Sequence, residues 1–167
     1  MADHEALFEL ANALVTELTG SGQAVATAES CTGGWIAKAI TDVPGSSACF
    51  AYGVVSYSNG AKESMLGVPN QTLEENGSVS EPVVRDMAQG ALNLSGADLA
   101  VAISGIAGPD GGTGDKPVGM VWIAWATRNG PKIIVQSECC QFDGDREAIR
   151  ERTVYRALEG ILERLGR

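Results

Sequence analysis

The chain has 167 residues and a formal net charge of −9, with 44% hydrophobic and 20% charged residues. These values are typical of a soluble globular protein with a sizeable core in one domain, residues 1–167. The negative charge argues against nucleic-acid binding, because phosphate contacts need a basic surface. No apolar run is long enough to span a membrane, and the acidic start of the chain is unlike a secretory signal. We therefore expect a cytoplasmic protein that binds neither nucleic acid nor a membrane.

The cysteine and histidine content argues against a metal site. The chain has four cysteines, none of them in a C-x-x-C pair, and one histidine, His4. Zinc sites draw on Cys and His at set spacings, so we expect no metal and no cofactor. The cysteines are predicted to be free thiols: Cys31, Cys49, Cys139 and Cys140.

The first part of the chain alternates between helical and extended patterns. Glycines and prolines follow the predicted helices, where they end such elements. In chain order the predicted elements are a helix over 3–19, a buried strand over 24–28, a helix over 32–41, a strand over 48–57, and a short helix capped by Ser58 and ended by Gly67.

The second part predicts an antiparallel addition to the sheet. Its predicted elements are a helix starting at Ser80, a buried strand over 99–103, a Gly-rich loop over 104–116, two strands over 118–126 and 132–139, and a final helix opened by residues 143–145. The Asn129-Gly130 pair is a hairpin signal between the last two strands. We therefore predict an α/β fold with helices on both faces of a mixed sheet.

One turn, Ala28 to Gly34, combines a nucleophile with an anion site. Ser30 and Cys31 lie where the strand over 24–28 passes into a helix. Backbone N–H groups at a helix start are unpaired and carry partial positive charge, so they can stabilise an anion or an oxyanion. Helix capping explains Ser30 equally well, and Thr32 could cap the same helix.

A serine nucleophile needs a base, and the one histidine, His4, lies near the terminus, where a solvated residue is expected. The base should then be a lysine, a tyrosine, a carboxylate or water. Lys62 follows the strand that ends at Tyr57 and could face the same ligand as Ser30, with a pKa lowered by burial. On spacing alone, a surface lysine is favoured. Cys31 is better explained as a small buried residue, because a thiol enzyme generally needs a histidine.

Two further segments could contact an anionic ligand. The loop from Ser104 to Gly114 is rich in glycine, which lets backbone N–H groups approach a phosphate or carboxylate. Arg146 stands in the first turn of the last helix, against the preference set by the helix dipole. This indicates an anionic ligand, although pairing with Asp143 or Glu147 explains it as well. Glu29 could orient a ligand or a lysine, or form an ordinary ion pair.

Together these residues resemble the CinA C-terminal domain family, of the nicotinamide mononucleotide deamidase type. The resemblance runs in order over nearly the whole chain from about residue 5. The segments that carry it are 26–34, 41–47, 53–59 with Lys62, 66–68, 77–80, 104–109, 116–119 and 144–146.

The resemblance implies an α/β/α sandwich that hydrolyses the carboxamide of nicotinamide mononucleotide to nicotinate mononucleotide and ammonia, in pyridine nucleotide recycling. It implies Ser30 as nucleophile with Tyr57 and Lys62 close to it, either of which could be the base. Family members usually have Thr at the position of Ser104, which keeps the hydroxyl. The residues expected around the substrate are Glu29, Thr32, Gly33, Gly34, Ser104, Gly105, Gly108 and Arg146.

Other interpretations remain open at this point. A pyridine-nucleotide-binding module without catalysis would use the same glycine-rich segments, because fold does not imply function. A thiol hydrolase using Cys31 is a third hypothesis. The family often carries a further N-terminal domain, which we expect to be absent here. We also expect a homo-oligomer, although an apolar helix face can pack inside one domain as well as against a second chain.

Overall fold

The computed structural model of the chain describes residues 3–165, which form one mixed five-stranded sheet in the order β2-β1-β3-β4-β5. β1 pairs in parallel with β2 and β3, whereas β4 is antiparallel to β3 and β5. The predicted mixed sheet and its late hairpin are confirmed. The strands are β1 (Val25–Glu29), β2 (Phe50–Val55), β3 (Leu99–Gly105), β4 (Met120–Asn129) and β5 (Lys132–Gln141).

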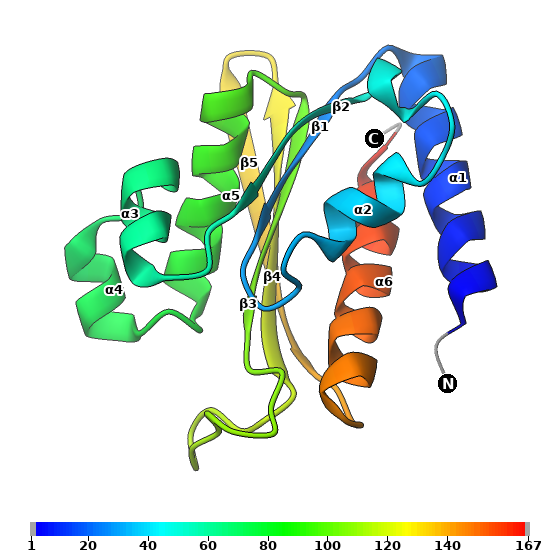
Figure 1. Cartoon of the computed structure of the whole chain (residues 1–167). Coiled ribbons are helices and arrows are strands. Elements are labelled where there is room, and N and C mark those ends of the chain that lie inside the picture. The colour runs from blue at the N-terminus through cyan, green and yellow to red at the C-terminus, as the bar shows by residue number, and fades with distance from the viewer. Residues whose placement is uncertain (1–2, 166–167) are drawn as a thin grey trace.

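Helices cover both faces of the sheet and give three layers (Figure 1). One face carries α1 (His4–Ser21), α2 (Trp35–Thr41) and α6 (Arg146–Arg164). The other carries α3 (Asn59–Leu66), α4 (Asn70–Asn76) and α5 (Glu81–Ser95), and a short 3-10 turn, η1 (Ser46–Ala48), precedes β2. The α/β/α sandwich is therefore confirmed. Within residues 3–165, no helix has the length and apolar content needed to cross a membrane.

Local sequence signals explain most helix ends. The Ser58 hydroxyl accepts the Ala61 N–H at 3.0 Å, and Gly67 ends α3 in the left-handed conformation. Two features differ from the expectations. α2 begins at Trp35 rather than Thr32, because Gly33 and Gly34 adopt positive φ and form a turn first. α4 had no predicted counterpart, whereas α1 begins at His4, close to the predicted start.

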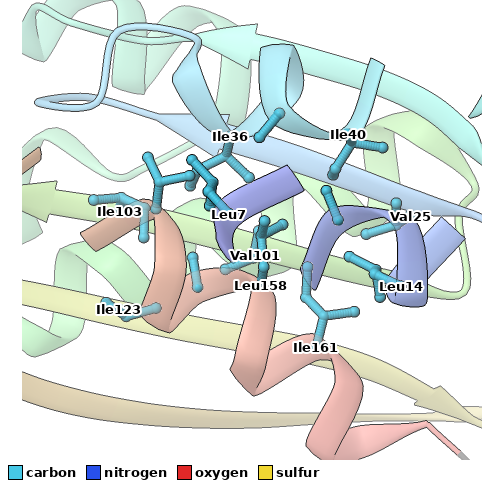
Figure 2. Close-up of a cluster of buried hydrophobic side chains, with 14 of the residues drawn as sticks. Leu7, Leu14, Val25, Ile36, Ile40, Val101, Ile103, Ile123, Leu158 and Ile161 are labelled. Atoms are coloured by element: carbon cyan, nitrogen blue, oxygen red, sulfur yellow. The ribbon is translucent and has the colours of Figure 1, made fainter. Parts of the chain in front are cut away.

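The larger of two cores lies between the sheet and the layer of α1, α2 and α6 (Figure 2). Its labelled side chains come from these helices and from the inner strands: Leu7, Leu14, Val25, Ile36, Ile40, Val101, Ile103, Ile123, Leu158 and Ile161. A second core lies under α5 on the opposite face. Because helices bury both faces, the carboxyl ends of the parallel strands are where a ligand can reach them.

Candidate active site

The segments that follow β1 and β2 meet at one edge of the sheet. β1 and β2 are parallel neighbours, with Glu29 opposite Val55. Ser30 therefore follows β1 close to where Lys62 enters from α3. The Lys62 Nζ lies 3.0 Å from the Ser30 Oγ. The structure thus brings together a hydroxyl and an amine that lie far apart in the sequence.

Lys62 is buried, with 1% of its surface exposed. Its Nζ also donates to two backbone carbonyls, those of Ser56 at 2.9 Å and Tyr57 at 3.0 Å. Burial lowers the pKa of Lys62 below its ordinary value, because water no longer solvates the ammonium; the nearby Cys31 acts in the opposite direction. The surface lysine that spacing alone favoured is therefore wrong.

Glu29 forms hydrogen bonds with the start of α2. Its carboxylate is buried and accepts the N–H groups of Ile36 at 2.9 Å and Ala37 at 3.1 Å. A carboxylate at a helix N-terminus satisfies donors that the helix leaves unpaired. Glu29 therefore caps α2, a task that capping preferences had assigned to Ser30 or Thr32. The Glu29 oxygens contact the start of α2, whereas we expected Glu29 to lie among the residues around the substrate.

The turn itself is compact. The Gly33 N–H donates to the Ser30 carbonyl and the Trp35 N–H to the Thr32 carbonyl, each at 3.0 Å. The N–H of Gly33, expected to face an oxyanion, is thus engaged inside the turn. Thr32 is fully buried, and its hydroxyl has no hydrogen-bond partner among residues 3–165.

Arg150 of α6 holds the turn from the other side. Its Nε donates to the Cys31 carbonyl at 3.0 Å and its Nη2 to the Thr32 carbonyl at 3.1 Å. Its guanidinium also lies over the Trp35 ring, 5.4 Å from the ring centroid. The sequence analysis missed Arg150. The signal was its position four residues after Arg146, which places the two on one helix face.

Cys31 lies next to the nucleophile candidate without sharing its environment. It is buried in the core. Burial raises the pKa of its thiol to about 11, although Arg150 lowers it in part. A thiol in this state is a poor nucleophile at neutral pH. The expected small buried cysteine is confirmed.

Tyr57 and Arg146 meet beside the serine–lysine pair. Tyr57 is 58% exposed, and its phenolic oxygen accepts a hydrogen bond from Arg146 Nη2 at 3.2 Å. Arg146 Nη1 donates to the Gly108 carbonyl at 2.6 Å. Arg146 therefore joins the segment after β2 to the loop after β3. This arrangement brings Tyr57, Gly108 and Arg146 together.

Ser104 and Gly105, at the end of β3, are two further residues that we expected around the substrate. The Ser104 hydroxyl is buried and donates to the Ser78 carbonyl at 2.6 Å, a partner that the sequence did not indicate. At Gly105, an added Cβ would lie 2.7 Å from the Val121 side chain. Close packing of β4 therefore accounts for this glycine, independently of any ligand contact.

A pocket of about 640 Å³ lies on the side of the turn toward α1. It is lined by the turn residues Thr32 to Gly34, by Trp35 and Arg150, and by α1 and α2 side chains. Neither Ser30 nor Lys62 is among its lining residues, so we place the candidate chemistry at the opposite side of the turn. Within residues 3–165, no three His, Cys, Asp or Glu side chains gather as metal ligands would.

The fold and the site define an α/β/α protein with a buried serine–lysine pair at the carboxyl edge of a mixed sheet. A model of the CinA C-terminal domain matches residues 7–165. The chain belongs to this family.

Two curated relatives are similar to this chain over nearly their whole length. The chain is 53% identical over 161 residues to nicotinamide-nucleotide amidohydrolase PncC of Escherichia coli K12, covering 96% of this chain and 95% of that protein. It is 54% identical over 154 residues to the protein of the same name from Pseudomonas putida, covering 92% and 94%. The crystal structure of the competence/damage inducible protein CihA from Agrobacterium tumefaciens has a TM-score of 0.88 and 46% identity, with 94% of each chain covered.

Proposed function

We propose that the chain hydrolyses the carboxamide of nicotinamide mononucleotide to nicotinate mononucleotide and ammonia. The names of relatives above 50% identity support an amidohydrolase that acts on a nicotinamide nucleotide. The observation that carries the chemistry is the 3.0 Å contact between the Ser30 Oγ and the Lys62 Nζ. Cytoplasmic location and a role in pyridine nucleotide recycling stay predictions.

The three oxygen partners of Lys62 can accommodate either an ammonium or a neutral amine, and the proposed base is the neutral amine. A neutral amine has two N–H donors and one lone pair. The carbonyls of Ser56 and Tyr57 can only accept, so they take both donors. The lone pair is then directed at the remaining partner, the Ser30 hydroxyl, and can take its proton. The lowered pKa of Lys62 acts in the same direction.

The reaction then follows in two steps. The Ser30 Oγ attacks the carboxamide carbon while its proton passes to Lys62, and the C–N bond breaks as Lys62 returns the proton to the leaving ammonia. Water attacks the resulting ester by the same route and releases the carboxylate. We assign the oxyanion to the N–H groups of Thr32 and Gly34, because Gly33 donates within the turn.

Tyr57 has a supporting role in this proposal. Its carbonyl orients Lys62, and its exposed phenol contacts Arg146. Arg146 can bind the substrate phosphate, since a guanidinium has five donors and two are engaged with Gly108 and Tyr57. Ser104, Gly105 and Gly108 form the adjoining wall.

Ammonia release from nicotinamide mononucleotide by the purified chain tests this function. We expect turnover in the wild type and none above background in Ser30→Ala. A matched control is Ser21→Ala, an exposed serine at the end of α1, which should keep full activity. Full activity in Ser30→Ala would remove Ser30 as nucleophile. Tight binding of the nucleotide by the wild type without turnover would favour the non-catalytic binding module instead.

A further inference from the structure

The pocket of about 640 Å³ beside the turn has no role in the proposed reaction. It lies among α1, α2 and α6, which cover one face of the sheet (Figure 1). Sites for small molecules have volumes of roughly 300–1,000 Å³, and they are lined by apolar and aromatic side chains with a few polar groups. This pocket is therefore large enough for a molecule of one or two rings.

Two helices each contribute an aromatic side chain to this pocket. Phe8 of α1 is 45% exposed, so its ring is available to a ligand. Trp35, the first residue of α2, is partly buried, and the Arg150 guanidinium lies 5.4 Å from its ring centroid. Leu7 and Ala39 add apolar surface to the wall. Because aromatic side chains pair favourably with planar rings, these walls favour an aromatic ligand.

The charged residues of the pocket leave one positive charge unbalanced, although the chain as a whole carries a net charge of −9. Lys38 and Asp42 are paired at 2.6 Å, so their charges cancel. In the part of the chain that the structure describes, Arg150 forms no ion pair. Its Nε and Nη2 donate to neutral backbone carbonyls, so its Nη1 can donate to an anionic ligand.

We propose that this pocket binds a small planar aromatic carboxylate, with its ring against Phe8 and Trp35 and its carboxylate at Arg150. A carboxylate carries one negative charge, which matches the one unbalanced charge of the pocket. A phosphate monoester carries about two negative charges, so it would leave an excess. The planar guanidinium also matches the geometry of a carboxylate.

The pocket is connected to the candidate active site through the turn. Residues 32–34 line the pocket and follow Ser30 closely in the chain. Arg150 holds the Cys31 and Thr32 carbonyls. A ligand bound to the Arg150 Nη1 leaves these two hydrogen bonds in place and restrains the arginine, and the turn with it. Occupancy of the pocket should therefore make Cys31 less accessible. Any effect on turnover rests on the proposed function, whereas binding and the accessibility of Cys31 do not.

Isothermal titration calorimetry with 2-naphthoate tests the binding. We expect one site per chain with a dissociation constant of about 1 mM or tighter. The neutral analogue 2-naphthalenemethanol, which lacks the carboxylate, should bind about tenfold more weakly.

A pair of variants places the ligand in this pocket. Phe8→Glu adds a negative charge to the pocket wall and should weaken the binding of 2-naphthoate by about tenfold or more. The matched control is Leu94→Glu, which adds the same charge at an exposed apolar residue of α5, on the other face of the sheet. It should leave the affinity unchanged. Circular dichroism checks that both variants are folded.

Alkylation of Cys31, read by peptide mass, gives a second measurement that needs no substrate. We expect saturating 2-naphthoate to slow alkylation in the wild type and in Leu94→Glu, and alkylation of Phe8→Glu to be unaffected at the same concentration. No binding at millimolar concentration would overturn the proposal. So would equal affinity for the neutral analogue, or binding that Phe8→Glu leaves unchanged, which would place the ligand elsewhere on the chain. Unchanged alkylation at saturation would overturn the connection between the pocket and the turn.

Discussion

The turn after β1 and the loop after β3 both follow buried parallel strands, but they are held in different ways. Ser30, Cys31 and Thr32 of the turn are buried, and the turn is fixed on separate sides by the Glu29 carboxylate, Lys62 and Arg150. The loop is exposed over residues 109–115, and its flanking contacts come from Arg146 to Gly108 and from Lys116 to Asn76. We infer that the turn performs the chemistry, which needs fixed geometry, and that the loop contributes to substrate binding.

Among the variants that test this difference between the turn and the loop, Lys62→Met should have the largest effect on activity. The substitution keeps the length of the side chain and removes the amine. We expect kcat to fall by about 10³-fold, the middle of the range for loss of a general base. Steady-state ammonia release measures it. The control is Lys38→Met, an exposed lysine paired with Asp42 on α2, which should change kcat little. Near-wild-type activity in Lys62→Met would show that another group is the base.

The pH profile gives a second measure of the same residue. Lys62 acts as a base in its neutral form, and burial lowers its pKa from the ordinary value of 10.5. The neutral fraction grows as pH rises through the lowered pKa, so kcat/KM should rise with pH and level off below 10.5. A rise that continues through 10.5 would contradict a buried Lys62.

Arg150→Lys tests whether the turn must be held in place. A lysine keeps the charge but cannot donate to both the Cys31 and Thr32 carbonyls as the guanidinium does. A small displacement of the nucleophile can cost about 100-fold in rate, so we expect kcat to fall by up to that factor with KM little changed. Thiol labelling gives an independent measure, since a loosened turn should expose Cys31 to alkylation, read by peptide mass. Unchanged kcat and unchanged labelling would show that Arg150 is dispensable. Arg152→Lys, on the exposed side of α6, is the control.

Arg146→Lys should weaken substrate binding more than it slows the chemical step. The substitution removes the fork that joins Gly108 to the Tyr57 phenol. We expect KM for nicotinamide mononucleotide to rise about tenfold, the scale of one charge-assisted hydrogen bond, while kcat changes less. The same variant assayed with the nucleoside, which lacks the phosphate, should show a much smaller change. An equal loss on both substrates would place Arg146 in the chemistry rather than at the phosphate.

Lys116→Met should have the smallest effect. Its Nζ donates to the Asn76 carbonyl, which ties the exposed loop to the end of α4. A partly exposed contact of this kind contributes about 1 kcal/mol, so we expect KM to rise by at most several-fold. A loss as large as that of Arg150→Lys would remove the distinction between the turn and the loop.

The sequence was sufficient for the sheet because strands and their turns depend on local patterns. Apolar runs predicted β1 and β3, Asn129-Gly130 marked the hairpin, and Ser58 and Gly67 bounded α3. The family resemblance named Lys62, but the residues alone favoured a surface position for it. Its burial depends on α3 packing beside the turn, which no local pattern records.

Other parts of the site depend on backbone atoms and on contacts between distant segments. The partners of Lys62 at Ser56 and Tyr57, and that of Ser104 at Ser78, are carbonyls, which every residue has. Capping of α2 by Glu29 spans the turn, so local capping rules pointed to Ser30 and Thr32 instead.

Rapid acid quench of the wild type mixed with excess nicotinamide mononucleotide tests the central claim most directly. We expect the peptide that contains Ser30 to gain the mass of the substrate less ammonia during the first turnover. Ser30→Ala should give no such adduct. Ammonia released in the first turnover with no adduct at any quench time, or with the adduct on Cys31 or Tyr57, would contradict a serine nucleophile activated by Lys62.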